Sequence, residues 1–460
     1  MFRMPKPYLA SVMVAIFLLL GLAACVHSFV KIFNGKIGLN DYTTYWALFA
    51  FGAALAALTA SSLFSRKPAP ENCALLLITI LVAVYLSELT LWVYSTSGHR
   101  SFEMNNRRAM YLEGIRKQGV PVDPRDTAEV VKDWRRSGIQ VVPMISPQEY
   151  LRSVSPRDLF PLSGVSRSFT YLCNESGQPT TYTSDEHGFR NPEGVWQRKP
   201  PVDMAILGDS FAMGACVEDG EDLASRIRKK YPSTINLGVA GTGSLIQLAV
   251  MREYLPSVRP RIVLWFYYDN DLDDLAEEIF NAHLRQYLDA GYSQDLIHRQ
   301  NEVDGVHARF LAKVFSRPAA APPTTWDTVR HRLRMKGVRN FTASLLEQLP
   351  VHWTRDTGDY TRIVGIAKKL VTDQGGTLYL VLLPDWEQMN RSAEDPAHRQ
   401  KDRVIAAAAQ CGVRVIDVQQ VFRKDSSPAQ RFFVFPGSHY NRIGYQVAAE
   451  YVLRCMEGQP

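Results

Sequence analysis

The chain has 460 residues, of which 46% are hydrophobic and 21% are charged, and it contains 29 Gly, 26 Pro and 6 Cys. This composition excludes a disordered chain, a collagen-like repeat and a small scaffold packed around disulfides. The net charge is +6, but of the 52 basic and 46 acidic residues only six and three lie up to Tyr94, which leaves 46 and 43 for the rest. Because this larger part is nearly neutral, its charge gives no reason to expect binding to nucleic acid.

Three stretches near the N-terminus are long and apolar enough to cross a lipid bilayer, which takes about 20 helical residues. They run over residues 8–30, 43–63 and 74–94, with tyrosine or tryptophan near their ends, where such rings favour the membrane interface. We therefore predict that residues 1–96 form a membrane anchor of three transmembrane helices. Three spans place the N-terminus and the C-terminal part on opposite sides of the membrane.

After the anchor, residues 97–200 are rich in charge, proline and serine, and predict an irregular leader that packs on the following domain. From residue 201 to 460, short apolar strands alternate with helices, which is typical of a parallel sheet covered on both faces. The predicted strands are 202–207, 234–237, 261–267, 377–383 and 413–418. The predicted helices include 223–230, 360–372, 401–410 and 442–456. Residues 272–350 interrupt this alternation and predict an insertion that can cover one end of the sheet.

Four of the six cysteines lie after the predicted anchor, at Cys173, Cys216, Cys411 and Cys455. In an oxidising compartment they can form up to two disulfides in three possible pairings, and the sequence does not choose among these. Free buried thiols are an equally good interpretation.

Polar residues recur where the predicted strands end, which is where sites form in parallel sheets. Gly208–Phe211 (Gly-Asp-Ser-Phe) follows the first strand and places Ser210 on the turn before a helix. Asn236–Gly243 follows the second strand and is rich in glycine, which lets the backbone approach a ligand closely. Tyr268–Asp271 ends the third strand, and His439 lies just before the last helix. Each motif alone is weak, but their order and positions together predict one site.

In these four motifs the sequence resembles the SGNH (GDSL-type) hydrolase superfamily, whose blocks contribute Ser, Gly, Asn and His in this chain order. The resemblance covers about residues 203–456 and implies a three-layer α/β/α, flavodoxin-like fold with a parallel central sheet. Upstream, residues 185–192 (Asp-Glu-His-Gly-Phe-Arg-Asn-Pro) resemble a segment of bacterial membrane-anchored members, several of which are linked to surface polysaccharides.

By this resemblance Ser210 is the nucleophile, His439 is the base, and the oxyanion hole consists of the Ser210 amide, Gly241 and Asn270. The chemistry agrees, because a serine hydroxyl becomes a good nucleophile only when a hydrogen-bonded imidazole accepts its proton. The tetrahedral oxyanion then needs fixed donors, and a backbone N–H and a carboxamide supply them without adding charge.

The sequence departs from the family pattern three residues before the histidine, where an acid usually orients the ring. Pro436 stands at that position, and the two residues after it are not acidic either. Three interpretations stay open: a Ser–His dyad suffices, a backbone carbonyl orients His439, or a distant carboxylate such as Asp417 does so.

Other charged residues near the motifs have simpler interpretations. Asp209 is expected to be a structural turn residue, and Arg190 either forms a salt bridge within the domain or holds an anionic group of the substrate. Acidic residues at the start of a helix are favoured by the helix dipole, which explains Asp271, Asp273 and Asp274 without a metal. The sequence has no zinc-type spacing of His and Cys and no phosphate-binding loop, so we expect no cofactor and no metal.

The function that these residues favour is a membrane-anchored serine esterase acting on acyl esters, acetyl esters among them, of an exported glycan or a related envelope substrate. A second hypothesis is transfer of the same acyl group from serine to a sugar hydroxyl of a cell-surface polysaccharide. A third is a non-catalytic binding or assembly module. The expected location is a bacterial inner membrane, with the C-terminal domain on the periplasmic side. The expected partners are the acylated glycan or a small ester, membrane lipids and envelope polysaccharide machinery, without nucleic acid.

Overall fold

The computed structural model describes Leu22, Ala53, Asp123 and residues 125–151, 153–154, 158–316, 357–385, 389, 396–424, 428–432 and 438–458. From Asp123 onward these residues belong to one compact unit, formed by residues 108–318 and 354–460. The three apolar stretches predicted to cross a membrane lie outside the described residues, apart from Leu22 and Ala53, which are helical. Within the part of the chain that is described, no helix has both the length and the apolar composition of a membrane span.

A central sheet of five parallel strands organises the C-terminal part. The strands are β4 (Met204–Leu207), β5 (Thr234–Asn236), β6 (Ile262–Tyr267), β7 (Thr377–Leu382) and β8 (Arg414–Asp417). They lie in the order β5-β4-β6-β7-β8, and Met204 of β4 is in register with Thr234 on one side and Ile262 on the other. This sheet confirms the predicted α/β class with parallel strands. The prediction was possible because each apolar strand is encoded by residues that are neighbours in the sequence.

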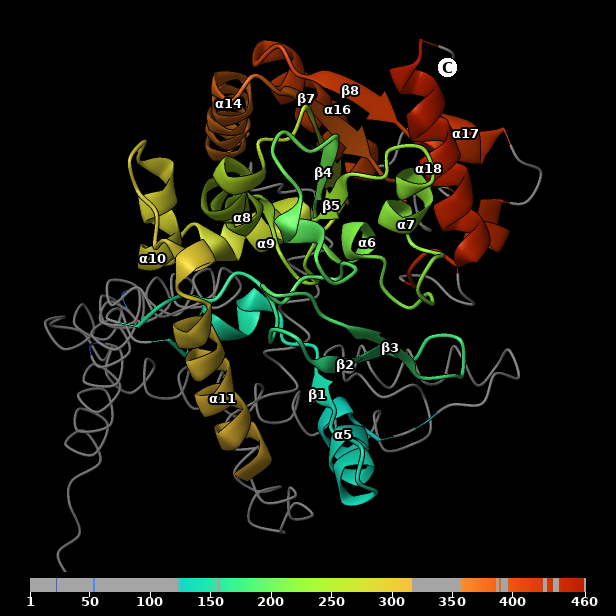
Figure 1. The fold of residues 1–460 in the computed structure, drawn as a ribbon. Helices are drawn as coiled ribbons and strands as arrows, with labels where there is room; N and C mark the ends of the chain where they lie inside the picture. Colours follow the sequence, from blue (N-terminus) through green and yellow to red (C-terminus); the bar gives the residue numbers. More distant parts are fainter. Residues whose placement is uncertain are drawn as a thin grey trace, which may run out of the picture. The chain divides into compact units, whose positions relative to one another are not determined.

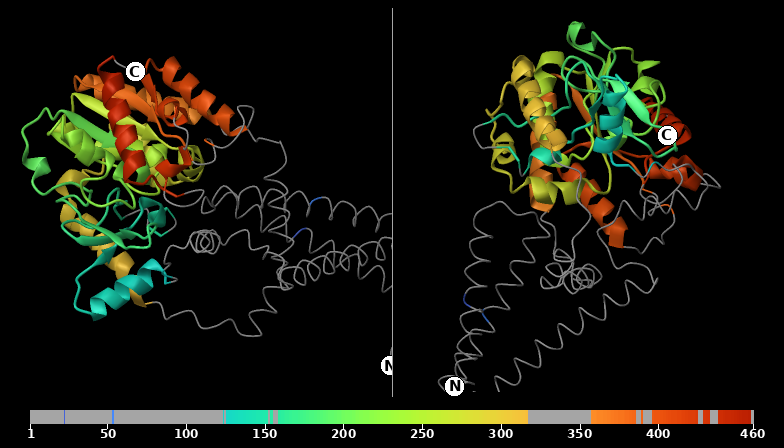
Figure 2. Two further views of the ribbon diagram at one scale, coloured as in Figure 1. Left: turned by 90° about the vertical axis from the view of Figure 1, so that its right-hand side faces the viewer. Right: turned by 90° about the horizontal axis from the view of Figure 1, so that it is seen from below.

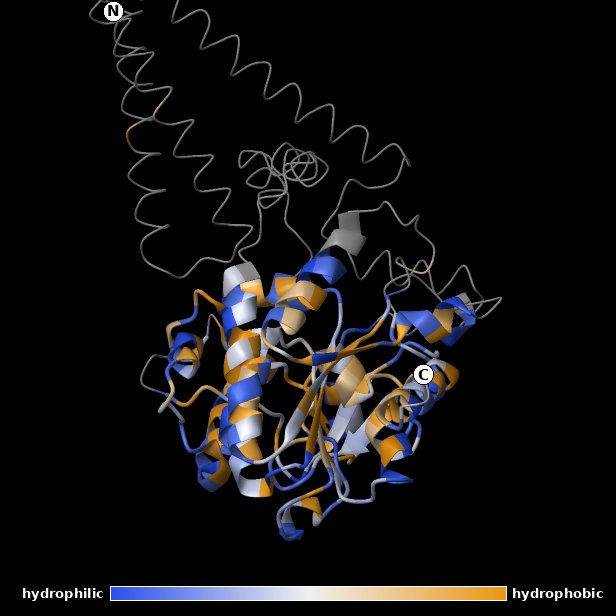
Figure 3. Cartoon of the chain, turned by 90° about the horizontal axis from the view of Figure 1, so that it is seen from above, coloured by the Kyte–Doolittle hydropathy of each residue, from blue (hydrophilic) through white to orange (hydrophobic). Residues whose placement is uncertain are grey.

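Helices cover both faces of this sheet (Figure 1). They are α7 (Leu223–Arg228), α8 (Ser244–Val258), α14 (Thr357–Asp373), α16 (Pro396–Gln410), α17 (Gln419–Arg423) and α18 (Arg442–Met456). Successive side chains of a strand point to opposite faces. In β4, Ala205 and Leu207 join a core with α8, α14 and α16, whereas Met204 and Ile206 join a second core with α7, α17 and α18. The hydrophobic strands between more polar helices are visible in Figure 3.

The strand order gives the sheet a topological switch point beside β4. Counted along the chain the order is 2-1-3-4-5, the flavodoxin-like order, in which the chain leaves the first strand to one side and returns on the other. Ligands of such sheets bind beyond the carboxyl ends of the strands at this point. The motifs that follow β4, β5 and β6 all lie at that end.

The leader has more regular structure than the sequence predicts. It contains α5 (Thr127–Arg136), β1 (Val142–Pro143), η1 (Pro147–Tyr150), β2 (Phe169–Cys173), β3 (Thr180–Thr183) and η2 (Val195–Gln197). The strands form a small sheet in the order β1-β2-β3, in which β2 and β3 make an antiparallel hairpin. Strands of two to five residues are too short to produce a clear periodic pattern, so the sequence did not reveal them.

The described part of the predicted insertion packs against α8. It contains α9 (Asp271–Glu278), α10 (Ala282–Arg285), η3 (Gln286–Leu288), η4 (Leu296–His298) and α11 (Gln300–Ser316), and α11 also contacts α5 of the leader (Figure 2). Buried Glu253 connects α8 to the insertion. Its carboxylate accepts hydrogen bonds from the Tyr287 hydroxyl at 2.5 Å and from the Leu296 amide at 2.8 Å. Residues 317–350 of the insertion lie outside the described residues.

Candidate active site

Ser210 stands on a sharp turn between β4 and the short helix α6 (Ser210–Met213). The turn depends on Gly208, whose φ of +142° is open only to glycine and whose position leaves no room for a Cβ, which would lie 2.6 Å from the carbonyl oxygen of Phe266. Asp209 caps α6 by accepting a hydrogen bond from the Phe211 amide at 2.9 Å. These contacts fix the backbone that presents the Ser210 hydroxyl.

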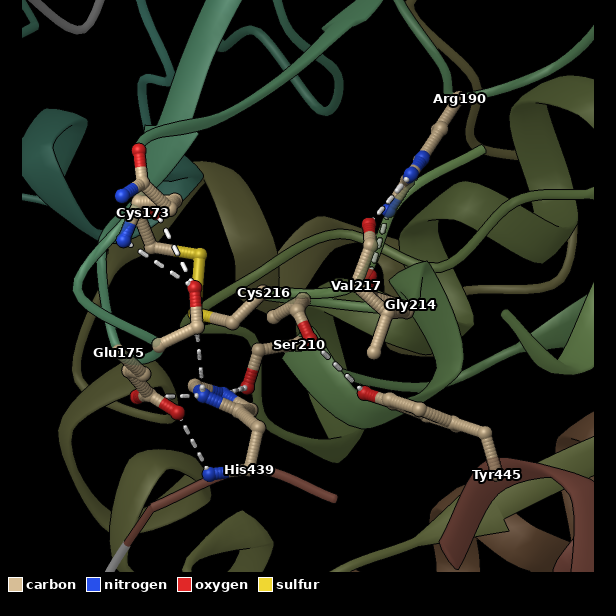
Figure 4. Close-up of a disulfide and its surroundings, with 12 residues drawn as sticks. Cys173, Glu175, Arg190, Ser210, Gly214, Cys216, Val217, His439 and Tyr445 are labelled. Atoms are coloured by element: carbon tan, nitrogen blue, oxygen red, sulfur yellow. Dashed lines mark hydrogen bonds and ion pairs between the residues drawn. A yellow bond between two sulfur atoms is a disulfide. The ribbon is translucent and has the colours of Figure 1, made fainter. Parts of the chain in front are cut away.

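His439 faces Ser210 from the segment before α18. Its Nε2 lies 2.8 Å from the Ser210 Oγ (Figure 4). The His439 ring packs on the Phe211 ring, and the two ring centroids are 4.8 Å apart. The next residue, Tyr440, is fully buried, and its hydroxyl donates a hydrogen bond to the Pro384 carbonyl. The structure therefore brings together the serine and histidine that the sequence predicts.

The third member of this chain of hydrogen bonds is Glu175, which the sequence analysis missed. Its Oε1 lies 2.8 Å from the His439 Nδ1, and its Oε2 accepts the backbone N–H of His439 at 2.9 Å. A carboxylate can only accept, so Nδ1 carries the proton and Nε2 is free to accept one from Ser210. Glu175 lies in the turn between β2 and β3 of the leader, so the leader is part of the site.

A disulfide ties this turn to the segment that follows the nucleophile. Cys173, two residues before Glu175, is bonded to Cys216, six residues after Ser210. Cys411 and Cys455 are free. Of the disulfides that the sequence allows, the described residues therefore form Cys173–Cys216. The disulfide lies directly beside His439, whose Nδ1 is 3.8 Å from the Cys216 Sγ (Figure 4).

Asp417, which the sequence offered as an orienting acid, is engaged elsewhere, and this prediction was wrong. One of its oxygens pairs with the Lys401 ammonium at 2.7 Å and the other accepts the Gln419 amide at 3.1 Å. It lies at the end of β8, which β6 and β7 separate from β4, whereas Glu175 occupies the position beside His439. Pro436, where the family pattern has its acid, lies outside the described residues.

Glu175 also sets the basicity of His439. Burial by itself would lower the pKa of His439, but the charge and hydrogen bond of Glu175, with a smaller contribution from Asp209, raise it above its ordinary value of 6.5. Burial raises the pKa of Asp209 to about 6, although the Phe211 amide and His439 oppose this. The site thus holds an imidazole that binds a proton more readily than a free one, as a general base requires.

The predicted oxyanion donors stand at the ends of the neighbouring strands. Gly241 has a φ of +65°, and a Cβ there would lie 2.7 Å from the Ser146 Oγ, which donates a hydrogen bond to the Gly241 carbonyl. Asn270 directly precedes α9 and donates one Nδ2 hydrogen to Asp274 at 2.7 Å. A carboxamide nitrogen carries two hydrogens, so a second remains for an oxyanion. Their role as donors stays a prediction.

Arg190 is structural in its contacts. Its side chain is 4% exposed and donates to the carbonyls of Gly214 and Val217 and to exposed Asp219. It therefore holds the segment that connects Ser210 to Cys216. Nearby, buried Asp185 accepts bonds from the Phe189 amide, the Asn191 carboxamide and the Trp196 indole. Asn191 in turn donates to the carbonyl of Asn236 in β5 at 2.8 Å, so the segment that includes residues 185–192 fastens the leader onto the sheet.

The acidic residues after β6 lie in the first turn of α9, as a helix dipole favours. Asp271 is fully buried, and this burial raises its pKa well above the ordinary value. Among the described residues, the group of His, Cys, Asp and Glu side chains close enough to share a metal ion is Glu175, Cys216 and His439. In the disulfide form Cys216 has no thiolate to offer, so this group acts here as part of the hydrogen-bond chain.

Comparison with known proteins found no family profile and no curated protein that matches the sequence. Solved structures of lipolytic and acyl-ester hydrolases do align with the chain. A lipolytic protein of the G-D-S-L family from Veillonella parvula is 12% identical, with 56% of this chain and 98% of that one covered and a TM-score of 0.31. The α/β hydrolase LAE5 from the metagenome of Lake Arreo is 16% identical, with 58% and 100% covered and a TM-score of 0.33. A lipase/acylhydrolase from Enterococcus faecalis is 13% identical, with 56% and 96% covered and a TM-score of 0.32.

Proposed function

We propose that this chain is a serine esterase that hydrolyses acyl esters through Ser210, His439 and Glu175. The observation that carries the proposal is the continuous chain of 2.8 Å contacts from the Glu175 carboxylate through both ring nitrogens of His439 to the Ser210 hydroxyl. Such a chain is what turns a weakly nucleophilic serine into a reactive one.

The reaction that follows from this geometry has two halves. The Ser210 Oγ attacks the acyl carbon while the His439 Nε2 takes its proton, and the resulting imidazolium is stabilised by Glu175. The tetrahedral intermediate expels the alcohol, which receives the proton from Nε2, and leaves the acyl group on Ser210. Water then attacks the acyl-serine with His439 again acting as base, which releases the acid and restores the hydroxyl.

The oxyanion of each intermediate would be held at the switch point of the sheet. The backbone N–H groups of Ser210 and Gly241, and the Nδ2 hydrogen of Asn270 that Asp274 does not accept, belong to the segments that follow β4, β5 and β6. Their positions are fixed by the sheet itself, so little reorganisation is needed when the negative charge develops.

The substrate we propose is an acyl ester, acetyl esters included, of an exported glycan or related envelope molecule, and the enzyme acts from a membrane anchor. Two observations support this location. The three apolar stretches of residues 8–94 have the length of membrane spans. The Cys173–Cys216 disulfide suits an oxidising compartment outside the cytoplasm.

The activity is tested by purifying the full chain in detergent and measuring acetyl-ester turnover. Ser210→Ala and His439→Ala should lower kcat by at least about 10³-fold, and Ser210→Ala should also lose labelling by a fluorophosphonate probe. Equal activity and equal labelling of wild type and Ser210→Ala would contradict the proposal. An acetylated acceptor sugar formed at the expense of free acetate would assign the acyl-serine to transfer instead, and absence of both turnover and labelling in wild type would favour a binding module.

The location is tested separately with a reporter fused after Pro460 that is active only in the cytoplasm. It should stay silent if the C-terminal domain is exported, while a reporter that works only after export should be active at the same position. The opposite pattern would contradict the exported arrangement without affecting the esterase proposal.

A further inference from the structure

The side of His439 that faces away from Ser210 gathers several metal-ligand atoms. The Cys216 Sγ, the His439 Nδ1 and a Glu175 carboxylate oxygen all lie within 4.8 Å of one another (Figure 4). The Cys216 sulfur is bonded to the Cys173 sulfur, which does not belong to this group of mutually close atoms. One sulfur, one imidazole nitrogen and one carboxylate oxygen make three ligand atoms, the number that a zinc site with one open position uses.

We propose that reduction of the Cys173–Cys216 disulfide converts this group into a binding site for a thiophilic divalent cation such as Zn²⁺, and that the bound metal prevents His439 from acting as a base. The metal site itself rests only on the geometry, whereas its effect on activity rests on the proposed function.

The separations already present are close to those of such a site. With Zn–S bonds of about 2.3 Å and Zn–N and Zn–O bonds of about 2.0–2.1 Å, tetrahedral geometry separates N from S by roughly 3.6 Å and N from O by roughly 3.3 Å. Here the His439 Nδ1 is 3.8 Å from the Cys216 Sγ and 2.8 Å from the Glu175 Oε1. Small side-chain movements are therefore enough to admit the ion.

The chemistry balances with a dithiol or phosphine as reductant. The S–S bond takes up two electrons from the reductant and two protons, and yields two thiols. On metal binding the Cys216 thiol releases its proton to solvent and one S–Zn bond forms, while the Cys173 thiol keeps its proton. The Cys216 thiolate and the Glu175 carboxylate then carry two negative charges beside the doubly charged ion, the imidazole binds as the neutral ring, and water takes the fourth position.

The disulfide is closest to solvent at Cys173, which is partly exposed, whereas Cys216 is buried. Cys216 also lines a cavity of about 270 Å³. Two acidic residues, Glu218 and Glu221, and one basic residue, Arg442, line the same cavity, so its charged side chains are acidic in the majority. A small reductant can therefore approach from the side of Cys173, and a metal ion through the cavity.

The bound metal would change the tautomer of His439. In the disulfide form the Nδ1–H of His439 donates a hydrogen bond to Glu175, and Nε2 accepts the hydrogen bond of the Ser210 hydroxyl. A metal on Nδ1 displaces that proton, and the neutral ring must then carry its proton on Nε2. Nε2 becomes a donor and no longer takes the proton of Ser210, while Glu175 is occupied as a ligand. Activation of the nucleophile is lost.

The experiment uses the full chain with Cys25, Cys73, Cys411 and Cys455 replaced by serine, so that only the two disulfide cysteines remain. The protein is reduced with a phosphine, freed of the reductant without air and titrated with Co²⁺, then with Zn²⁺. The reduced protein should bind one Co²⁺ per chain, with the thiolate-to-cobalt charge-transfer band and intense visible bands of a tetrahedral site, and Zn²⁺ should displace it. The oxidised protein should show neither band.

Variants separate the site from the function. Ser210→Ala should bind Co²⁺ as well as its parent does, because it removes no ligand. Since the loss of even an outer-shell partner costs about 10- to 100-fold in metal affinity, Glu175→Ala and His439→Ala should weaken Co²⁺ binding at least about tenfold. In active enzyme, one equivalent of Zn²⁺ should lower turnover at least about tenfold after reduction but not before, and a chelator followed by reoxidation should restore it.

Equal Co²⁺ binding by reduced and oxidised protein, a spectrum without the charge-transfer band, or unchanged affinity in His439→Ala would each overturn the proposal. Loss of the far-ultraviolet circular dichroism on reduction would overturn it too, since the ligands would no longer be held together. If the metal binds as expected but no variant or form has esterase activity, the metal site stands and the proposed function fails.

Discussion

Glu175 holds His439 at two points, with one carboxylate oxygen on the ring Nδ1 at 2.8 Å and the other on the backbone N–H at 2.9 Å. The two contacts fix both the position of the histidine segment and the orientation of its ring. Because Glu175 is buried beside the ring, it also favours the imidazolium that forms when Ser210 gives up its proton. One carboxylate thus combines the positioning and the electrostatic parts of the site.

Replacing Glu175 by Gln should lower kcat by about 10²- to 10⁴-fold, because the amide can stabilise the wrong tautomer of His439 and carries no charge. KM for a small acetyl ester should change little, since Glu175 lies on the far side of His439 from Ser210. The matched control is Asp417→Asn, which removes a carboxylate that pairs with Lys401 and should leave kcat within about twofold of wild type. A large loss in Asp417→Asn with none in Glu175→Gln would reverse the assignment.

The pH dependence of kcat/KM should report the raised pKa of His439. The base must be neutral, so activity should rise with pH through a value above the ordinary 6.5. Glu175→Gln removes the two largest interactions that raise this pKa and leaves burial opposed only by the smaller contribution of Asp209, so the residual activity should titrate at lower pH. A full pH–rate profile of both proteins checks this, and an acid limb that does not move, or that moves upward, would speak against the role of Glu175.

Asn270→Ala should lower kcat by about 10²- to 10³-fold with little change in KM, as expected when one donor to an oxyanion is removed. The variant also removes a 2.7 Å hydrogen bond to Asp274, which keeps the one from Gln148, so its free energy of unfolding should be measured alongside. Retention of full kcat in a folded Asn270→Ala protein would mean that the oxyanion is held by the backbone amides alone.

Gly208→Ala should destabilise the domain by more than about 3 kcal/mol, because the new Cβ would meet the Phe266 carbonyl at 2.6 Å and φ is +142°. Gly220→Ala is the control, since Gly220 also has a positive φ, +93°, but nothing lies within 4 Å of its added Cβ. That variant should cost only about 1–2 kcal/mol, from the backbone alone. Denaturant unfolding of both compares them, and equal losses would show that crowding at the nucleophile turn is unimportant.

Arg190→Ala should lower the free energy of unfolding by about 2–4 kcal/mol, because two buried carbonyl contacts lose their charged donor. Asp219→Asn should cost less than about 1 kcal/mol, since the Asp219 side chain is 71% exposed and water screens its ion pair with Arg190. If the two variants were equally stable, Arg190 would not be a structural residue, and its alternative role in holding an anionic substrate group would gain support.

The sequence by itself determined the features that depend on neighbours along the chain. The five strands of the parallel sheet, the serine after β4, the glycine-rich turn after β5 and the histidine before α18 are all encoded by local patterns. A buried parallel strand reads as an apolar run wherever it occurs, and the turn residues that follow it are fixed by backbone sterics. The resemblance of these motifs to the SGNH superfamily then pointed to Ser210 and His439.

Only the tertiary structure decided which acid completes the site and which cysteines pair. Glu175 lies 264 positions before His439 in the chain, and Cys173 lies 43 positions before Cys216. Strands as short as β2 and β3 give no clear periodic pattern, and nothing local shows where the hairpin that they form packs. Its place follows from contacts between the leader and the rest of the domain, such as those of Asn191 with Asn236 of β5 and of Arg190 with Val217, which exist only once the chain has folded.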